Sequence, residues 1–256
     1  MSNGIPVRLL MEDGTVRTLP MEEYLRGVVP VEMPPQWPLE ALKAQAVAAR
    51  TYALVMIQDA RHADQGADLC TTEHCQAYRD RREASTDEAV RQTEHQILTF
   101  PERKVYTFYS AACGGHTANN EEAWPGSNPV PYLRGVPCPC ARPVKGHRVG
   151  MCQHGARVLA EQGKPYDQIL AHYYQGTRLD AVPPSPGTLS LDSPVLGPAT
   201  GSKEQAAAFL KRTMGHEYSA HDVDLILGYY WRFGPQAGVD PFLAVAQSIY
   251  DTGAWR

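Results

Sequence analysis

The segment from Ala181 to Gly201, AVPPSPGTLSLDSPVLGPATG, constrains the fold most, because it divides the chain into two unequal parts. It contains five prolines and three glycines, no lysine or arginine, and a single acidic residue. Such a composition favours a semi-extended linker over a packed element. We therefore predict a first domain at residues 1–180, a linker at 181–201 and a smaller C-terminal piece at 202–256.

The composition excludes several classes of function. The chain has 256 residues, 43% of them hydrophobic, which is enough for one large core or two modest ones. Its 28 acidic and 24 basic residues give a net charge of −4, so we expect no nucleic-acid partner. No apolar run is long enough to span a membrane. The first residues, MSNGIP, lack a signal-peptide pattern, which leaves the export route unknown. The oligomeric state does not follow from the sequence.

Hydrophobic spacing and turn residues predict helices and strands in mixed order, which indicates an α+β fold. Asp13-Gly14 is typical of a hairpin turn, and Pro38 fits the first position of a long helix. Ser85 and Glu88 match a capping box. The predicted elements of the first domain are a hairpin over 5–20, helices at 21–29, 38–60, 85–95 and 155–163, and strands at 96–100 and 104–111.

Glu32 lies in the predicted loop VEMPPQW between two helices, where Pro34 and Pro35 stiffen the backbone beside Trp37. A carboxyl group that is partly removed from water in such a loop has a raised pKa and can act as a general acid. The alternative is an ordinary surface glutamate.

Lys43 and Arg50 are seven residues apart on the predicted long helix and therefore share one of its faces. An arginine among alanine and valine side chains needs an anionic partner, either in the protein or in a ligand. Alternatively, both side chains extend along the helix to reach water.

The segment HADQGADLCTTEHC holds four potential metal ligands within a short loop: His62, Cys70, His74 and Cys75. Zinc binds tetrahedral sets of nitrogen and sulfur ligands, so these residues predict a structural zinc site. A Cys70–Cys75 disulfide or free thiols are the alternatives.

A second group comprises Cys113, His116, Cys138, Cys140 and Cys152. The first four of these residues could form a Cys3His metal site. Disulfides are equally open if the protein is exported. In a third interpretation Cys113 is a nucleophile, with His116 or His147 as its base. The chain has no HExxH, GxSxG, Walker or GxGxxG motif, so we do not expect zincin, serine-hydrolase or nucleotide chemistry.

The segment GHRVGMCQHGA frames His147, Gln153 and His154 with glycines, which allow a close approach of the backbone to a ligand. Neutral donors and acceptors of this kind, with aromatic rings nearby, are typical of sugar sites. The alternative is a glycine-rich loop that only leads into a helix.

Taken together, several segments of residues 5–180 resemble the stage II sporulation protein D (SpoIID/LytB) family. They are EYLRGVVPVEMPPQWPLEALKAQAVAARTYAL, CQAY, FYSAACGGHTANNEEAW, PYLRGV and GHRVGMCQHGARVLAEQG, in this order. The resemblance implies an α+β peptidoglycan lytic transglycosylase in which Glu32 is catalytic and Lys43 and Arg50 contact the glycan. It also implies a zinc site in the loop after the long helix, formed by Cys70, His74 and Cys75, with His62 as the weakest ligand.

The implied reaction uses one carboxyl group, whereas hydrolytic glycosidases usually use two. Glu32 protonates the glycosidic oxygen between MurNAc and GlcNAc and then accepts the proton of the MurNAc C6 hydroxyl, which forms a 1,6-anhydro ring. The chemistry itself needs no cofactor. The substrate is glycan strands, either intact or denuded. The alternative implied function is a non-catalytic glycan-binding module that activates a cell-wall amidase. Either function implies action at the cell wall, outside the cytoplasm.

The final loop departs from the family pattern GHGVGMSQ at two positions. Arg148 replaces a glycine, and Cys152 replaces a serine, which weakens hydrogen bonding to a sugar at that position.

The C-terminal piece predicts three helices, at residues 202–215, 219–234 and 240–255. Its last 20 residues, AGVDPFLAVAQSIYDTGAWR, resemble the opening of a glucosaminidase-type, lysozyme-like domain. The catalytic glutamate of that fold corresponds to Asp251, so we expect no second active site and a truncated or packing role for this piece.

Overall fold

The computed structural model describes residues 5–101, 103–181, 202–207, 220–233, 241 and 245. The chain divides into two compact units, Met1–Ser185 and Pro186–Arg256. Helices and strands occur in mixed order, which confirms the α+β class. The predicted linker at 181–201 lies outside the described residues, except for Ala181.

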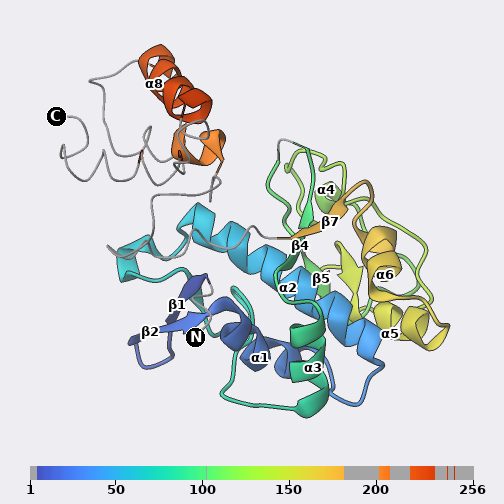
Figure 1. The fold of residues 1–256 in the computed structure, drawn as a ribbon. Helices are drawn as coiled ribbons and strands as arrows, with labels where there is room; N and C mark the ends of the chain where they lie inside the picture. The colour runs from blue at the N-terminus through green and yellow to red at the C-terminus, as the bar shows by residue number, and fades with distance from the viewer. Residues whose placement is uncertain are drawn as a thin grey trace. The chain divides into compact units, whose positions relative to one another are not determined.

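The N-terminal unit is built from short strands and helices around one long helix, as Figure 1 shows. In chain order the elements are β1 (Pro6–Leu10), β2 (Val16–Pro20), α1 (Met21–Glu32), α2 (Leu39–Asp59), the 3-10 turn η1 (Ala63–Gln65), β3 (Leu69–Cys70), α3 (Ala84–Gln92), β4 (Gln96–Thr99), β5 (Tyr109–Ser110), α4 (Asn120–Ala123), β6 (Met151–Cys152), α5 (Gln153–Glu161), α6 (Tyr166–Tyr173) and β7 (Arg178–Ala181).

The described strands form three small sheets. The predicted hairpin is confirmed: β1 and β2 pair antiparallel, with Gly14 in the left-handed region at φ 84°, and β3 adds parallel to β1. The predicted strand at 104–111 is wrong except for β5, which pairs parallel with β6. The strand β4 is confirmed, and it pairs antiparallel with β7. The sequence did not reveal β7, because its residues directly precede the proline-rich stretch in the chain.

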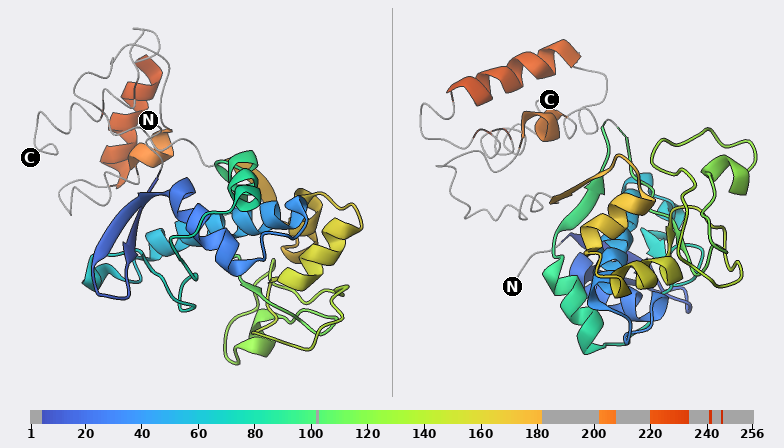
Figure 2. Two further views of the ribbon diagram at one scale, coloured as in Figure 1. Left: turned by 90° about the horizontal axis from the view of Figure 1, so that it is seen from below. Right: turned by 90° about the vertical axis from the view of Figure 1, so that its right-hand side faces the viewer.

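Helix α2 is the central element of this unit, and 14 of its 21 residues are buried. It contacts α1 and α3 as well as α5 and α6. Two hydrophobic clusters meet along it: Ala44 and Val47 belong to the one with α5 and α6, and Ala49 and Tyr52 to the one with α1 and the hairpin. Figure 2 shows α2 covered by other elements along most of its length.

Three helix ends differ from prediction. Helix α1 continues through Pro30 to Glu32, so Glu32 ends a helix instead of lying within a loop. Pro38 precedes α2 as its N-cap and is not its first residue. The capping box at Ser85 is wrong, because α3 begins one residue earlier and the Ser85 hydroxyl donates instead to the carbonyl of Pro35, at 2.6 Å. A longer-range bond thus takes the place of the local cap.

The C-terminal unit is described in part. Residues 203–207 and α8 (Ala220–Phe233) are helical, in line with two of the three predicted helices. Ala206, Val223, Leu227 and Val245 form a small buried cluster. Asp251 lies outside the described residues.

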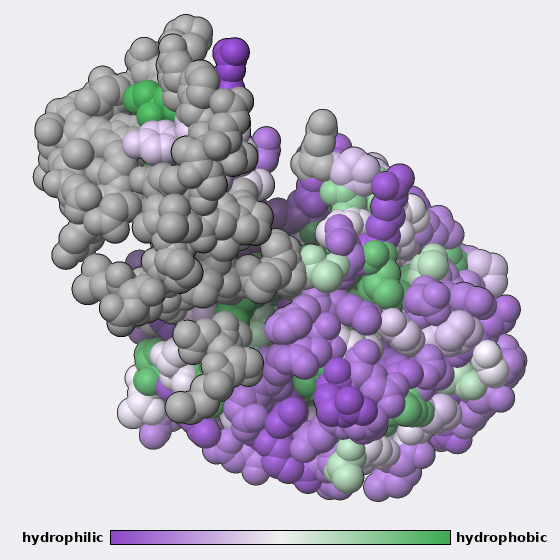
Figure 3. All heavy atoms as spheres, in the orientation of Figure 1, coloured by the Kyte–Doolittle hydropathy of each residue, from purple (hydrophilic) through white to green (hydrophobic). Residues whose placement is uncertain are grey.

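The visible face of the N-terminal unit is mostly hydrophilic, with scattered hydrophobic side chains (Figure 3). No helix within the described ranges is long and apolar enough to cross a membrane.

Gly27 tests the packing of α1. A Cβ atom there would lie 2.2 Å from the Tyr78 ring and 2.7 Å from the carbonyl oxygen of Arg79. We expect Gly27→Ala to lower the free energy of unfolding by about 1–3 kcal/mol, because overpacking outweighs the better helix propensity of alanine. Chemical denaturation measures the change.

Gly228 in α8 is the control, since the nearest atom to its added Cβ is 3.9 Å away. Gly228→Ala should leave stability unchanged or raise it by up to about 1 kcal/mol. If Gly27→Ala behaved in the same way, the close packing of α1 against Tyr78 would be wrong.

Candidate functional site

Glu32 is partly buried at the C-terminal end of α1, where two segments distant in sequence reach its carboxyl group. The backbone N–H of Ala77 donates to Oε1 at 3.1 Å. The side-chain amide of Gln153, the first residue of α5, lies 3.5 Å from Oε2 and also donates to Oε1 of Gln45 at 3.2 Å. The structure therefore brings two predicted site residues, Glu32 and Gln153, together.

A buried chain of neutral groups orients a third donor to Glu32. The Nε2 group of Gln76 donates to the Tyr109 hydroxyl at 2.9 Å and to the carbonyl of Ala49 at 3.3 Å, while its Oε1 accepts from Tyr24 at 3.0 Å. Since the Tyr109 oxygen accepts from Gln76, its own proton is available to the Glu32 carboxyl group, with which it hydrogen-bonds. The carboxyl group therefore has three uncharged donors.

The pKa of Glu32 is raised above its usual value, and burial is the largest cause. The hydrogen bonds from Ala77, Gln153 and Tyr109 act in the opposite direction, and the negative charge of Glu73 adds to the increase. Burial also holds the pKa of Tyr109 well above its usual value, so this hydroxyl remains a donor. The direction of this pKa shift favours the protonated form of Glu32, as a general acid requires.

The structure does not bring Lys43 or Arg50 to Glu32. Arg50 is fully buried and forms an ion pair with Glu22, with 2.5 Å between Nη2 and Oε2. It also donates to the carbonyl of Gln96 at 3.0 Å. Lys43 pairs with Glu40 at 2.6 Å and lies over the Tyr166 ring. The anionic partner that an arginine in this position requires is therefore part of the protein.

His147 and His154 each lie against a partly exposed tryptophan. The ring centroids of His154 and Trp37 are 4.9 Å apart, and those of His147 and Trp124 are 5.2 Å apart. Burial lowers the pKa of both imidazoles, which favours their neutral form. These pairs offer flat aromatic surfaces beside neutral polar groups.

Arg148, between these two histidines, adopts a left-handed backbone with φ 65°. A glycine would adopt this conformation without steric cost, whereas other residues are strained by about 1–2 kcal/mol. The departure from the family pattern at this position therefore has a structural cost.

The first predicted ligand group converges in the structure. The donor atoms of His62, Cys70, His74 and Cys75 all lie within 4.8 Å of one another. The distance from His62 Nε2 to Cys75 Sγ is 3.2 Å, and His74 Nδ1 lies 3.7 Å from Cys70 Sγ and 3.6 Å from Cys75 Sγ. Zinc bonds of about 2.3 Å to sulfur and 2.0–2.1 Å to nitrogen place tetrahedral ligands about 3.6 Å apart. These residues therefore fit zinc.

The donor atom of His62 lies within the same 4.8 Å limit as those of the other three ligands. Its second ring nitrogen lies 3.2 Å from Oε1 of Gln65, which would fix the tautomer that leaves Nε2 for a metal. The same loop continues from Cys75 into Gln76 and Ala77, so the ligand group shares one short segment with Ala77, one of the donors to Glu32.

The second predicted group does not assemble as expected. Cys113 and Cys140 come together with Cys152, and their sulfur atoms lie within 4.8 Å of one another. Cys138 is also in contact with Cys113 and Cys152. The ring of His116 instead hydrogen-bonds to the backbone carbonyl of Thr117, with 2.6 Å between Nδ1 and the oxygen. All six cysteines are free thiols in the structure. Cys152 replaces His116 because β6 runs parallel to β5, beside the segment that carries Cys113.

A surface hollow lies beside the hairpin and contains none of the predicted site residues. It is lined by Met11, Glu12, Asp13, Thr71, Tyr78, Arg79 and Asp80. Its mixed charges give no indication of a specific ligand, and the chemistry at Glu32 lies elsewhere.

The sequence reading did not single out Gln45, Gln76, Ala77 and Tyr109 as site residues. Gln45 and Gln76 are fully or almost fully buried amides. The signal available for two of them was the CQAY segment, which directly follows the metal-like cluster.

Comparison with known proteins identifies relatives of the N-terminal unit. Residues 12–100 match the model of the family SpoIID, described as stage II sporulation protein. An uncharacterised protein of Brachyspira hyodysenteriae is 40% identical over 122 residues, which cover 47% of this chain and 33% of that protein. The chain thus spans about a third of that relative.

Two proteins of Bacillus subtilis also match. Its stage II sporulation protein D is 25% identical over 261 residues, covering 64% of this chain and 76% of that protein. Its amidase enhancer is 40% identical over 110 residues, covering 43% of this chain but only 14% of that protein.

The ion pair of Arg50 yields a prediction that separates a structural role from glycan binding. Arg50→Met leaves the carboxylate of Glu22 unpaired, so the free energy of unfolding should fall by about 3–5 kcal/mol. Arg50→Met combined with Glu22→Gln should cost less than the two changes added together.

Arg91→Met is the matched control, because Arg91 pairs with Glu88 at the surface and should contribute at most about 1 kcal/mol. Urea denaturation and sedimentation with purified sacculi measure stability and binding. Weaker sacculus binding by Arg50→Met with unchanged stability would contradict the structural role.

Proposed function

We propose that the N-terminal unit, in which residues 12–100 match the SpoIID family model, acts on the bacterial cell wall as a lytic transglycosylase. Its substrate is the glycan strand of peptidoglycan, and the bond cleaved joins MurNAc to GlcNAc. The observation that carries the proposal is the environment of Glu32: a partly buried carboxyl group, with a raised pKa, held by uncharged donors. The unit works outside the cytoplasm, where this substrate lies.

The absence of cations among these contacts removes an obstacle to acid catalysis. A lysine or arginine beside the carboxyl group would lower its pKa and favour the ionised form. Lys43 and Arg50 are instead paired with Glu40 and Glu22. In this proposal Lys43 and Arg50 support glycan cleavage indirectly, because they stabilise the packing of α2, and α2 carries Gln45 and Ala49 at the site.

Both carboxyl oxygens of Glu32 accept hydrogen bonds, Oε1 from the N–H of Ala77 and Oε2 from the amide of Gln153. The protonated carboxyl group transfers its proton to the glycosidic oxygen as the bond to C1 breaks, and GlcNAc leaves as an alcohol. The C6 hydroxyl of MurNAc then attacks C1 and returns its proton to the carboxylate. No water is consumed, and a 1,6-anhydro ring forms.

The donors around Glu32 serve the second half of this cycle. After proton transfer, Ala77, Tyr109 and Gln153 stabilise the carboxylate until it takes up the proton from C6. Trp37 with His154 and Trp124 with His147 supply aromatic faces and neutral polar groups for sugar rings.

A zinc ion at His62, Cys70, His74 and Cys75 has a structural role in this proposal. When bound, it cross-links the loop that leads into Gln76 and Ala77. The glycan chemistry takes place at Glu32 and does not involve the metal.

An alternative function is a glycan-binding module that activates a cell-wall amidase. The observation in its favour is the 40% identity with the amidase enhancer of Bacillus subtilis. In that case Glu32 contributes a hydrogen bond to the glycan instead of a proton, and a partner enzyme performs the cleavage.

Product analysis with Glu32→Gln tests the proposal. Purified sacculi, both intact and stripped of peptides by an amidase, are incubated with each protein and the soluble products are analysed by mass spectrometry. The wild-type protein should release products lighter by one water than those of hydrolysis. Glu32→Gln should lose this activity by a factor of about 10² or more while remaining folded, because glutamine cannot donate the proton.

Glu73→Gln is the matched control, since Glu73 acts on Glu32 only through its charge. It should retain anhydro products, because no second carboxylate takes part. Products that carry the added water and disappear in Glu73→Gln would instead indicate a two-carboxyl hydrolase. Sacculus binding and amidase activation by both wild type and Glu32→Gln, with no released glycan, would support the binding module.

A further inference from the structure

Four cysteines from three separate segments gather in the hydrophobic cluster that includes α5 and α6. Cys113 follows β5, Cys138 and Cys140 lie in a loop, and Cys152 ends β6. None of the four is more than 8% exposed. The sulfur atoms of Cys113, Cys140 and Cys152 lie within 4.8 Å of one another, and Cys138 is in hydrogen-bonding contact with Cys113 and Cys152.

We propose that Cys113, Cys138, Cys140 and Cys152 bind a second structural zinc ion, separate from the one at His62, Cys70, His74 and Cys75. Four thiolates are a common ligand set for structural zinc. With zinc–sulfur bonds of about 2.3 Å, tetrahedral sulfurs stand about 3.8 Å apart, and those of Cys113, Cys140 and Cys152 lie within 4.8 Å of one another. Cys138 joins them through its contacts with Cys113 and Cys152.

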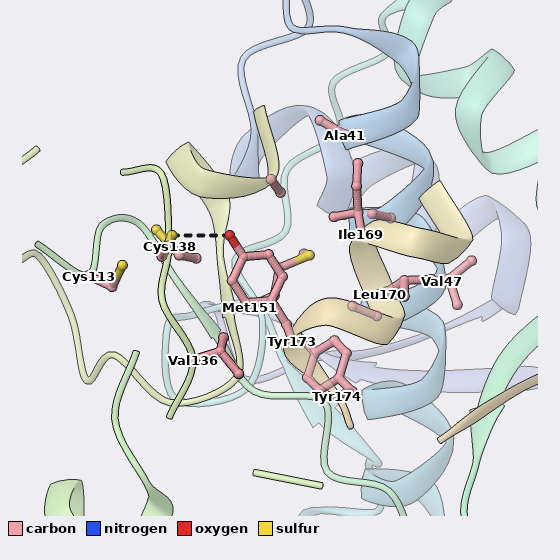
Figure 4. Close-up of a cluster of buried hydrophobic side chains, with 14 of the residues drawn as sticks. Ala41, Val47, Cys113, Val136, Cys138, Met151, Ile169, Leu170, Tyr173 and Tyr174 are labelled. Atoms are coloured by element: carbon pink, nitrogen blue, oxygen red, sulfur yellow. Dashed lines mark hydrogen bonds between the residues drawn. The ribbon is translucent and has the colours of Figure 1, made fainter. Parts of the chain in front are cut away.

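Hydrogen-bonding groups lie beside two of the sulfurs. The backbone N–H of Gly155 donates to Cys152 Sγ at 3.3 Å, and Cys152 is the N-cap of α5, where the helix dipole favours negative charge. The hydroxyl of Tyr173 lies 3.1 Å from Cys138 Sγ (Figure 4). Such donors around a metal site hold the ligands in place and offset their charge.

Gly155 leaves the space that this arrangement needs. A Cβ atom at this position would lie 2.2 Å from both Cys138 Sγ and the Tyr173 hydroxyl, and 3.4 Å from Cys152 Cβ. The close approach of α5 to the sulfurs therefore depends on a residue without a side chain.

The chain around the cluster shows why a cross-link is useful. The segment between β5 and β6 contains one short helix, α4. Isolated β-bridges, such as the one between Ala112 and Lys145, connect other parts of this segment. A segment with so little regular structure gains stability when a metal connects its parts. The ion would also fix the start of α5, where Gln153 follows Cys152 and reaches Glu32.

Metal content and X-ray absorption of the whole wild-type chain test the site. The protein is purified in reducing buffer without chelators, and its zinc is measured by mass spectrometry of the elements. Two zinc ions per chain are expected. Because one site has two sulfurs and two nitrogens and the other has four sulfurs, the zinc absorption spectrum should average three sulfurs and one nitrogen per ion.

Variants assign the two ions without relying on enzymatic activity. Cys152→Ser should lower the zinc content from two ions to one, as should Cys70→Ser with Cys75→Ser. In the latter protein the remaining zinc should have sulfur neighbours alone. His116→Ala is the matched control and should retain both ions, since its ring does not reach the cluster.

Several results would overturn the proposal. One zinc per wild-type chain, with an intact mass lower by two hydrogens for each bond, would indicate disulfides. One zinc with alkylatable thiols at the cluster would show that it binds no metal, and iron in place of zinc would assign a different metal. Loss of an ion in His116→Ala would show that the ligand set is wrong. The wild-type spectrum decides the question even if a variant fails to fold.

Discussion

Helix α2 has to be packed on almost every side at once, because 14 of its 21 residues are buried. Small alanine side chains allow α1, α3, α5 and α6 to approach it closely. The buried polar residues of α2 then need partners inside the protein, and each partner fixes another element. Arg50 binds Glu22 of α1, and Thr51 accepts from the backbone of β4 at 2.9 Å. The burial of one helix thus determines where the remaining elements lie.

The same burial creates the conditions at Glu32. The segment after the first ligand group, β5 and the start of α5 meet around this carboxyl group at the end of α1, and each supplies an uncharged donor. Burial raises the pKa more than these donors lower it. Lys43 and Arg50 do not lower this pKa through the contacts described, since they pair with Glu40 and Glu22. A protonated carboxyl group is what the proposed chemistry requires.

Local patterns predicted the hairpin, α2 and α3. They also singled out Glu32 and the first ligand group as candidate site residues. Pairings over long distances were not predictable: the partner of β4 is β7, and Ser85 bonds across to Pro35 instead of capping its helix. The partner of Arg50 was not predictable for the same reason, because spacing along a helix shows that a buried charge needs a partner without showing which one. Cys152 joined the cysteine cluster through the β5–β6 pairing, which no motif encodes.

The measurement that tests the central claim most directly is the titration of the Glu32 carboxyl carbon by NMR, with ¹³C-labelled glutamate and Glu32→Gln to assign the signal. A free glutamate ionises near a pKa of about 4.3. The account predicts that the Glu32 signal still reports a protonated carboxyl group at pH values where the exposed glutamates have ionised. A Glu32 signal that titrates together with the exposed glutamates, or below them, would contradict it.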